Sequence, residues 1–171
     1  MEFYRPTLLD TEKHQRDGFT SGEPSLDEWL RRYAGQNRRG NTAAVWVIAD
    51  RGYRVVCYAT LSMTSVDRAA SPAPLAKSAP MQVPALLVGR LATDTRVTGL
   101  GLGTHIVKHF LATAAELYLK AACRAVVVTA LNPTAFSWWQ RFGFIPFDSE
   151  DPTHLDLYLL TKDIGATLAR L

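Results

Sequence analysis

Residues 86–104 form the stretch of this chain whose residue types point most directly to chemistry. An apolar run ends at Asp94, and a short loop then brings Gly99, Gly101 and Gly103 to the start of an amphipathic helical pattern. Glycine permits positive φ and a close approach of the backbone to a ligand. A helix N-terminus adds unpaired N–H donors and the positive end of the helix dipole. The order of strand, glycine loop and helix therefore predicts a site for phosphate groups.

Two common nucleotide-binding motifs do not fit this loop. A P-loop requires Lys followed by Ser or Thr after its last glycine, whereas Gly103 is followed by Thr104 and His105. The dinucleotide fingerprint spaces its glycines unevenly and needs an acidic residue farther on, whereas these glycines are evenly spaced. A turn that contains glycines for purely local reasons is the alternative interpretation.

The loop resembles the acyl-CoA-binding signature of the GNAT acetyltransferases, Gln/Arg-x-x-Gly-x-Gly/Ala, through the run Arg96-Val97-Thr98-Gly99-Leu100-Gly101. The resemblance implies that acetyl-CoA is the acyl donor, with its diphosphate on the loop amides and its pantetheine arm along the preceding strand edge. A backbone N–H near Leu91 would hold the thioester carbonyl oxygen. The positions implied in binding are Leu91, Ala92, Thr93, Arg96, Thr98, Gly99, Leu100, Gly101, Gly103, Thr104, Asn132 and Trp138.

Residues 132–144 look like a later motif of the same family, Asn-x-x-Ala-x-x-Phe-Tyr-x-x-x-Gly-Phe. Pro133 suits the first turn of a helix, and Gly143 suits the position just after its end. The alternative is a short helix whose aromatic residues, recurring from Phe136 to Phe142, belong to the core. The second motif follows the first in the family's order, which favours the GNAT interpretation.

Alignment on Gly143 places Trp139 where the family has a tyrosine, which the resemblance makes the general acid toward the leaving thiolate. An indole N–H donates a hydrogen bond but releases no proton at a useful pH. Trp139 could orient the thioester, while Ser137, Tyr158 or water supplies the proton; these three stay open. The sequence therefore predicts slow acetyl transfer, or a member of the family that lacks catalysis.

Length and composition are those of an ordinary globular domain. The chain has 171 residues, 47% hydrophobic and 20% charged, with a formal net charge of +3, and we expect a single domain over residues 1–171. No apolar run is long enough for a membrane span, and the N-terminus lacks the apolar segment of a signal peptide. Two isolated cysteines indicate no disulfide framework. We therefore expect a cytoplasmic protein without a membrane partner.

Hydrophobic periodicity predicts an α/β fold with one mixed sheet and helices on both faces. The resemblance implies the GNAT fold, in which this mixed sheet is mostly antiparallel. A hairpin turn is expected at Asp50–Gly52, and the proline-containing stretch Ala69–Pro84 is expected to be irregular. The expected strands are Ala43–Ala49, Arg54–Ser62, Ala85–Thr93, Ala125–Leu131 and Leu155–Leu160. The expected helices are Ser25–Arg39, Gly103–Ala122 and Thr134–Arg141.

Residues 19–30 and 87–94 resemble the corresponding stretches of the GNAT toxins of type II toxin–antitoxin modules. Those toxins acetylate the α-amine of an amino acid already charged onto tRNA, and translation stops. The resemblance implies aminoacyl-tRNA as a partner, a ribbon-helix-helix antitoxin, and contact with operator DNA only through that antitoxin. It also implies a homodimer.

Arginines supply a weak, independent indication of a polyanionic partner. The sequence predicts a capping box of Ser25 and Glu28 at the start of the helix Ser25–Arg39. That helix would align its arginines on one face, where they could follow a phosphate backbone; a solvated polar face is the alternative. The predicted tRNA-binding residues are Arg31, Arg32, Arg38, Arg39 and Arg90.

Two smaller patterns leave alternatives. Arg90 lies within an apolar strand, where it could face the phosphates of the acceptor or pair with a structural carboxylate such as Asp94. His105 and His109 have a helical spacing that suits metals, but no third ligand is near in the sequence. We therefore expect a polar helix face and no metal.

Three functions remain open from the sequence. The first is the tRNA-acetylating toxin just described. The second is a GNAT enzyme that acts on a small amine or a protein N-terminus, with the arginines idle. The third, favoured by Trp139, is an impaired member that binds acetyl-CoA or an antitoxin without turnover.

Overall fold

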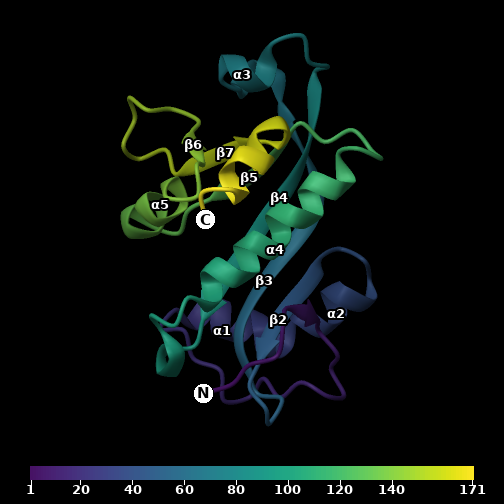
Figure 1. The fold of residues 1–171 in the computed structure, drawn as a ribbon, viewed down its shortest axis with the longest axis vertical. Coiled ribbons are helices and arrows are strands. Elements are labelled where there is room, and N and C mark those ends of the chain that lie inside the picture. Colours follow the sequence, from purple (N-terminus) through teal and green to yellow (C-terminus); the bar gives the residue numbers. More distant parts are fainter. The chain divides into compact units, whose positions relative to one another are not determined.

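The computed structural model describes residues 1–171, which divide into two compact units (Figure 1). The first unit consists of residues 1–62 and 89–109, and the second of residues 63–88 and 110–171. Three elements contribute to both units: β3 (Val55–Asp67), β4 (Gln82–Thr93) and α4 (Leu102–Leu117). The expectation of one domain over the whole chain stays a prediction.

The strands form a mixed sheet in the order β1-β2-β3-β4-β5-β7-β6. β5 (Ala125–Thr129) pairs with β4 in parallel and with β7 (Asp156–Leu160) in antiparallel orientation. The pairs of β1 with β2, β2 with β3, and β6 with β7 are also antiparallel. The predicted mixed, mostly antiparallel sheet is therefore confirmed.

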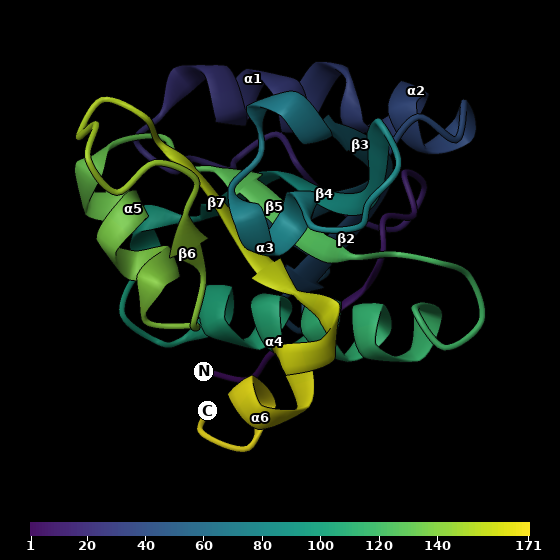
Figure 2. The same ribbon diagram turned by 90° about the horizontal axis from the view of Figure 1, so that it is seen from above.

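In the first unit, helices lie on both sides of the strands. Figure 2 shows α1 (Pro24–Arg32) and α2 (Ala34–Arg39) on one side of the sheet and α4 on the other. β2 (Ala44–Ala49) runs between β3 and the short β1 (Thr7–Leu8). The sequence prediction missed β1, because two residues carry no detectable alternation.

The core of the first unit forms where the apolar stripe of α1 meets the strands. Burying apolar side chains against the sheet is the main force that holds this helix in place. Trp29 stacks on Tyr58, with 5.9 Å between the ring centroids, and the Tyr58 hydroxyl donates a 2.8 Å hydrogen bond to the Leu26 carbonyl oxygen. The buried members are Leu9, Phe19, Trp29, Leu30, Ala34, Val45, Val47, Val55, Tyr58 and Ala92.

The predicted turn at Asp50–Gly52 joins β2 to β3 and is organised by one carboxylate. The carboxylate of Asp50 accepts hydrogen bonds from the amides of Gly52 (2.8 Å) and Arg54 (3.0 Å), and from Arg54 Nε (2.8 Å). Tyr53 adopts a φ of 61°, a conformation that a bulky residue rarely takes without such support.

The predicted helix Ser25–Arg39 is wrong in one respect: it is two helices. Tyr33, with φ −112°, interrupts the chain between α1 and α2. The arginine pairs before and after Tyr33 therefore do not lie on one continuous helix face.

The predicted capping box is also wrong. The helix begins at Pro24, whose fixed φ suits the first helical position, so Glu23 is the N-cap and Ser25 lies inside the helix. Asp27 instead accepts hydrogen bonds from the amide (2.9 Å) and the hydroxyl (2.6 Å) of Ser21. This buried carboxylate fastens the chain segment that leads into α1.

The second unit contains the later strands and the remaining helices. α5 (Pro133–Gln140), β6 (Ile145–Pro146) and α6 (Ile164–Leu168) follow β5, and Figure 2 shows α6 on the same side of the strands as α4. The stretch predicted to be irregular contains a 3₁₀ turn, Arg68–Ala70, and the short helix α3 (Ala73–Ala76). The buried core of this unit is Leu75, Ala85, Ala125, Val127, Tyr158 and Leu160.

The other predicted strand and helix boundaries agree with the structure within a few residues. The exceptions are β3 and β4, which are longer than predicted, and α4, which ends earlier. β3 continues to Asp67 and β4 begins at Gln82, because alternation persists at the exposed ends of both strands. α4 ends at Leu117 rather than Ala122, in a turn where the Lys120 amide donates to the Leu117 carbonyl oxygen at 2.8 Å.

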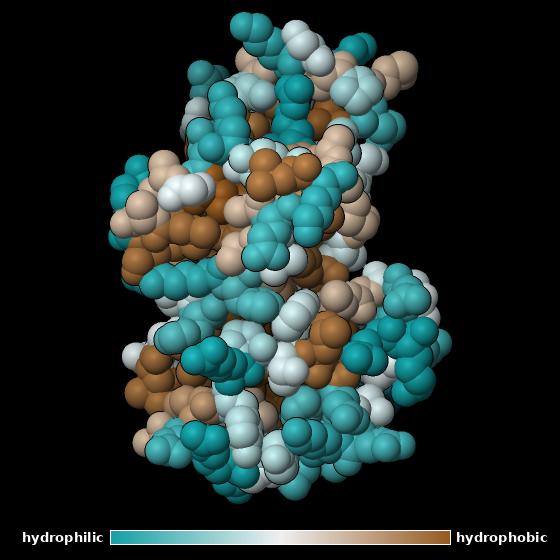
Figure 3. Space-filling view, turned by 45° about the vertical axis from the view of Figure 1, so that its right-hand side comes forward, coloured by the Kyte–Doolittle hydropathy of each residue, from teal (hydrophilic) through white to brown (hydrophobic).

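The outer surface is mixed in polarity. On the face drawn in Figure 3, hydrophobic side chains stand between hydrophilic ones rather than covering that face. No helix of the protein has both the length and the apolar character needed to cross a membrane.

We predict that Asp27→Ala lowers the free energy of unfolding by about 1–3 kcal/mol, because it leaves the Ser21 donors without their partner. The matched control is Glu28→Ala, which removes only the exposed ion pair of Glu28 with Arg32 (3.1 Å) and should cost about 0.5 kcal/mol or less. Urea denaturation at pH 7 measures both. A larger loss for Glu28→Ala would contradict this account of the helix start.

Candidate functional site

The C-terminal part of β4 has a free edge. Its parallel ladder with β5 pairs Ala85–Val88 with Ala125–Val128 and stops there, whereas β4 continues to Thr93. The backbone groups of residues 89–93 that point away from β3 therefore have no strand partner. The predicted positions Leu91, Ala92 and Thr93 all lie on this edge, which can offer hydrogen bonds to an extended amide-containing ligand.

The loop after β4 presents its amides at the start of α4. Gly99 and Gly101 have φ values of 85° and 79°, and a Cβ at either position would meet open space. The first hydrogen bond of the helix runs from the His105 amide to the Gly101 carbonyl oxygen (3.0 Å). The amide N–H groups of Leu102, Gly103 and Thr104 therefore have no hydrogen-bond acceptor within the helix. Both glycines are needed for their conformation, and together with the helix start they form a cradle that fits a diphosphate.

Asp94, at the end of β4, holds this loop in place through its carboxylate. Its carboxylate is fully buried and accepts hydrogen bonds from the amides of Thr20 (3.1 Å) and Arg96 (3.0 Å). Arg96 adds a two-pronged ion pair, with Nε at 2.8 Å from Oδ1 and an Nη atom at 2.7 Å from Oδ2. Burial alone raises the pKa of the Asp94 carboxyl, but the Arg96 guanidinium and the two amides outweigh burial and lower that pKa. Asp94 is therefore a charged structural anchor at neutral pH.

Arg96, the first residue of the predicted motif, uses its side chain to hold the protein together. Besides the pair with Asp94, it donates to the Gly18 carbonyl oxygen at 3.2 Å. The role of Arg96 in cofactor binding stays a prediction, and what the side chain does in the structure is to tie the N-terminal segment to the loop.

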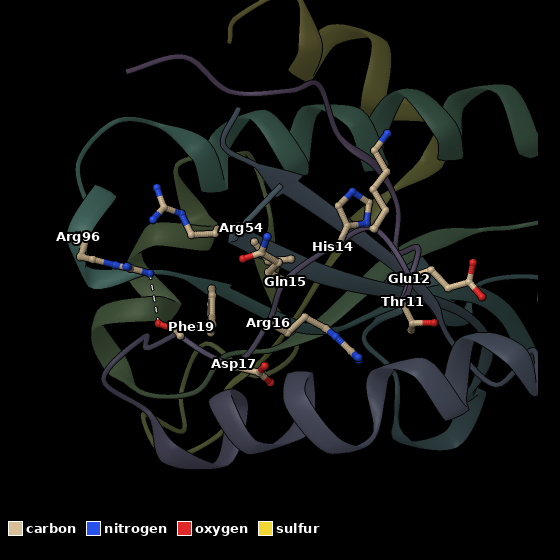
Figure 4. A pocket seen from close by; sticks show the side chains of 12 residues that line it. Thr11, Glu12, His14, Gln15, Arg16, Asp17, Phe19, Arg54 and Arg96 are labelled. Atoms are coloured by element: carbon tan, nitrogen blue, oxygen red, sulfur yellow. Dashed lines mark hydrogen bonds between the residues drawn. The ribbon is translucent and has the colours of Figure 1, made fainter. Parts of the chain in front are cut away.

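A pocket lies beside Arg96 (Figure 4) and was not found by sequence reasoning. It has a volume of about 560 Å³ and is lined mostly by the segment Thr11–Phe19, with Arg54, Val55 and Arg96. Arg54 and Arg96 are neutralised by Asp50 and Asp94, and Glu12 and Asp17 offset the remaining cations. The pocket therefore carries no clear excess of either charge. No sequence signal marks it, because the lining comes from an irregular segment.

In the second unit, residues 132–144 fold as the later motif predicts. The Asn132 carboxamide oxygen caps α5 by accepting from the Ala135 amide at 2.8 Å, and Pro133 takes the first helical position. Gly143 has a φ of 86°, and a Cβ there would lie 3.2 Å from Thr167 Oγ1. Asn132 therefore has a structural role as the cap of α5. The predicted role of Asn132 and Trp138 in cofactor binding stays a prediction.

Trp139 lies in an aromatic cluster. It is 4% exposed, and its ring meets Trp138 and Phe144 edge-on, with centroid distances of 5.1 Å in each case. The indole nitrogen forms no hydrogen bond within the chain. The aromatic side chains of this helix therefore belong to the core, as the alternative interpretation expected. The indole N–H of Trp139 is nevertheless left without an acceptor in the chain.

The other candidate proton donors differ in accessibility. Tyr158 is 2% exposed and packs edge-on against Phe147, and burial raises the pKa of its phenol. Ser137 is exposed on α5. Cys57 is no candidate nucleophile, because burial raises the pKa of its thiol to about 12 and a thiol acts as a nucleophile through its thiolate.

The arginines predicted to align on one helix lie on two helices, and their role in binding tRNA stays a prediction. Arg31 donates to the Phe19 carbonyl oxygen at 3.0 Å, and Arg32 pairs with Glu28 on the exposed face of α1. Arg38 and Arg39 lie on α2, where they line a separate hollow of about 290 Å³. The expected alignment fails because Tyr33 separates the two helices.

The side chain of Arg90 lies against an aromatic ring and not against Asp94, the carboxylate that was the alternative expected from the sequence. Its guanidinium lies 4.3 Å from the centroid of the Trp29 ring, an arrangement that favours a cation. Asp94 pairs with Arg96 and not with Arg90, so the predicted Arg90–Asp94 pair is wrong. Arg90 is half-buried on the free part of β4.

Comparisons with known proteins agree with this geometry. The sequence profile of the acetyltransferase (GNAT) family matches residues 8–144. A tRNA-acetylating toxin of Mycobacterium tuberculosis (strain ATCC 25618 / H37Rv) is 35% identical over 150 residues, which cover 88% of each chain.

Solved structures share the fold. AtaT complexed with acetyl-methionyl-tRNAfMet is 25% identical, with a TM-score of 0.85 over 96% of this chain and 98% of that chain. A point mutant of KacT is 24% identical, with a TM-score of 0.87 over 97% and 99% of the two chains. With a family profile that spans most of the sequence and a relative above 30% identity, this chain belongs to the acetyltransferase (GNAT) family.

Proposed function

We propose that this protein is the toxin of a type II toxin–antitoxin module that transfers acetyl from acetyl-CoA to the α-amine of aminoacyl-tRNA and so blocks translation. The observation that carries the proposal is the pair of left-handed glycines, Gly99 and Gly101, directly ahead of α4 and after the free edge of β4. The acceptor is inferred from the relative in Mycobacterium tuberculosis, which is a tRNA-acetylating toxin.

The residues of this chain fit the donor. The amides from Gly99 to Thr104 would hold the diphosphate, because the helix dipole and the unpaired N–H groups favour negative charge there. The free edge at Leu91, Ala92 and Thr93 would bind the pantetheine arm through backbone hydrogen bonds. When bound, acetyl-CoA supplies an activated acetyl thioester.

The chain needs little base catalysis for this acceptor. An α-amine with a pKa near 8 is about one-tenth neutral at pH 7, whereas a lysine with a pKa near 10.4 is almost wholly charged. The neutral nitrogen forms a bond to the carbonyl carbon, and a backbone N–H near Leu91 would stabilise the negative oxygen. The bond to sulfur then breaks, the nitrogen loses a proton to water, and the sulfur takes up a proton.

In this proposal Trp139 orients the departing sulfur but does not protonate it. Its indole N–H is free within the chain and can donate a hydrogen bond, although it releases no proton. We propose that water or the exposed Ser137 supplies the proton and that turnover is slow. A catalytically impaired member that still binds acetyl-CoA or an antitoxin is the second candidate, and the tryptophan at this position is the observation that favours it.

The partners follow from the same proposal. AtaT has been solved with the C-terminus of the antitoxin AtaR, and KacTA with DNA. We propose that a ribbon-helix-helix antitoxin neutralises this protein, that operator DNA is contacted only through it, and that the protein is a homodimer. Since charged tRNA is the acceptor, the protein would act in the cytoplasm.

The direct test is mass spectrometry of charged tRNA incubated with the protein and isotopically labelled acetyl-CoA. We expect labelled acetyl on the α-amine of the esterified amino acid. Label on a small amine alone would favour the broader GNAT activity, and binding of acetyl-CoA without transfer would favour the impaired member.

Gly101→Ala should raise the dissociation constant for coenzyme A at least tenfold, because a φ of 79° strains any residue with a Cβ and turns the cradle amides away. Gly165→Ala in α6 is the control, since a Cβ there also meets open space but its φ is ordinary. Isothermal titration calorimetry measures both. Equal affinities for the two variants would contradict the diphosphate site.

Trp139→Tyr should raise the acetylation rate by about 100-fold or more, because a phenol can act as the general acid that an indole cannot. Trp139→Phe shortens the side chain in a similar way without adding a hydroxyl, so it should give no gain. Single-turnover assays with charged tRNA measure the rates. A gain of only a few-fold for tyrosine would show that this position is not the proton donor.

Asp94→Asn should lower the free energy of unfolding at pH 7 by about 1–3 kcal/mol, because the buried acceptor of Arg96 and Thr20 loses its charge. Since folding lowers the pKa of Asp94, the stabilisation is complete above the ordinary carboxyl pKa and disappears as pH falls through the lowered value. In urea denaturation from pH 7 to pH 3, the difference in unfolding free energy between the two proteins should therefore begin to narrow below the ordinary carboxyl pKa. The exposed Asp17→Asn is the control, and a gap that does not narrow in acid would refute the anchor.

A further inference from the structure

A hollow in the second unit gathers cations without any acidic residue. It has a volume of about 450 Å³ and lies between α3, the end of α4, and the adjoining ends of β5 and β7. No ion pair involves Lys77, Arg124 or Lys162. The residues that line it are Pro74, Lys77, Tyr118, Arg124, Leu160, Thr161 and Lys162, and we name it the Tyr118 pocket.

The charge of the Tyr118 pocket is unusual for this chain. Its three cations carry +3, which equals the formal net charge of the whole protein. By contrast, the pocket beside Arg96 is balanced by carboxylates. Uncompensated cations on one concave surface favour an anionic ligand with more than one charge.

Backbone contacts hold the pocket in shape before any ligand arrives. One Arg124 Nη atom donates to the carbonyl oxygens of Leu75 (3.3 Å) and Lys77 (2.8 Å), which joins β5 to α3. The Thr161 hydroxyl donates to the Arg124 carbonyl oxygen at 3.0 Å, and the Thr161 amide donates to it at 2.9 Å. The lysines on either side therefore extend from fixed backbone, and a rigid site loses less entropy on binding.

The rest of the lining is apolar and partly aromatic. Tyr118 is 37% exposed at the end of α4, and Leu160 and Pro74 line the hollow with it. An exposed tyrosine ring beside unpaired cations suits a ligand that combines a planar group with phosphates. Nucleotides in single-stranded segments have both, and stacking on an aromatic side chain tolerates any base.

We propose that the Tyr118 pocket binds a nucleotide segment of the acceptor RNA, with Lys77, Arg124 and Lys162 toward the phosphates and the Tyr118 ring stacked on a base. This inference rests on the proposed function, because it is the acceptor of that reaction that supplies the RNA. Only the terminal aminoacyl group of such an acceptor reacts, so the rest of the RNA requires contacts elsewhere on the protein. The pocket contributes affinity and does not take part in the chemistry.

The test measures binding of uncharged tRNA to the full chain by fluorescence anisotropy over a range of salt concentrations. The double variant Lys77→Gln, Lys162→Gln should weaken binding at least tenfold and reduce the slope of log Kd against log salt by about 1.4–1.8, as expected for two lost phosphate contacts. Arg124 is left unchanged because it also holds α3. Lys120→Gln is the control, since this exposed lysine follows α4 without lining the pocket.

Tyr118→Leu separates stacking from charge. It should weaken tRNA binding by about 5- to 100-fold and leave the salt slope unchanged, because no charge is removed. Affinity for coenzyme A should stay the same in all variants, which shows that they are folded.

The outcomes distinguish this inference from the proposed function. Native affinity and salt slope in the double variant would overturn the RNA site, even if charged tRNA is acetylated normally. Loss of binding to an acidic peptide with unchanged tRNA binding would also overturn it, since the pocket would then bind protein. Weaker tRNA binding in the variants would support the site even if no acetylated tRNA is found, a result that would reject only the proposed reaction.

Discussion

The buried carboxylate of Asp94 is the contact on which the diphosphate loop depends. It sits between β4 and the glycines, and it binds the Thr20 amide, the Arg96 amide and the Arg96 guanidinium at once. A buried charge of this kind is tolerated only because each of its oxygens has partners. The same ion pair fixes where β4 ends and where the turn toward Gly99 begins. On the strand side of the loop, the Asp94 carboxylate accepts the Arg96 amide, whereas the amides at the start of α4 have no partner within the helix.

Two further devices leave backbone groups free in this part of the chain. β4 runs past the end of its ladder with β5, so that residues 89–93 keep an unpaired edge. Positive φ at Gly99 and Gly101 then delivers the chain into α4. Unpaired backbone groups are costly when buried, and in our proposal acetyl-CoA supplies the missing partners along this strand edge and helix start.

Much of this arrangement could be predicted from the sequence, and the failures have identifiable causes. Strands with continuous apolar runs, such as β2 and β5, and the glycine loop depend on local properties of consecutive residues. The break at Tyr33 could not be predicted, because the apolar stripe continues across it from Leu30 to Ala34. The capping box failed because the helix begins at Pro24, which makes Glu23 the N-cap, two residues before Ser25. The partners of Asp94 and Arg90 depend on which side chains the fold brings together, and sequence spacing does not contain that information.

The positions of the basic residues also show that sequence spacing does not reveal which side chains the fold brings together. Four arginines close together in the sequence suggested an RNA-binding row, yet the fold uses Arg31 to hold the Phe19 carbonyl and Arg32 to pair with Glu28. Lys77, Arg124 and Lys162 are far apart in the sequence, and the ends of α3, β5 and β7 bring them together around Tyr118. No carboxylate compensates Lys77, Arg124 or Lys162, although Arg124 also donates to two backbone carbonyl oxygens. Three such positive charges around one hollow act together on an anionic ligand. In our proposal, the cations that contact RNA at the Tyr118 pocket are therefore brought together by the fold and not by proximity in the sequence.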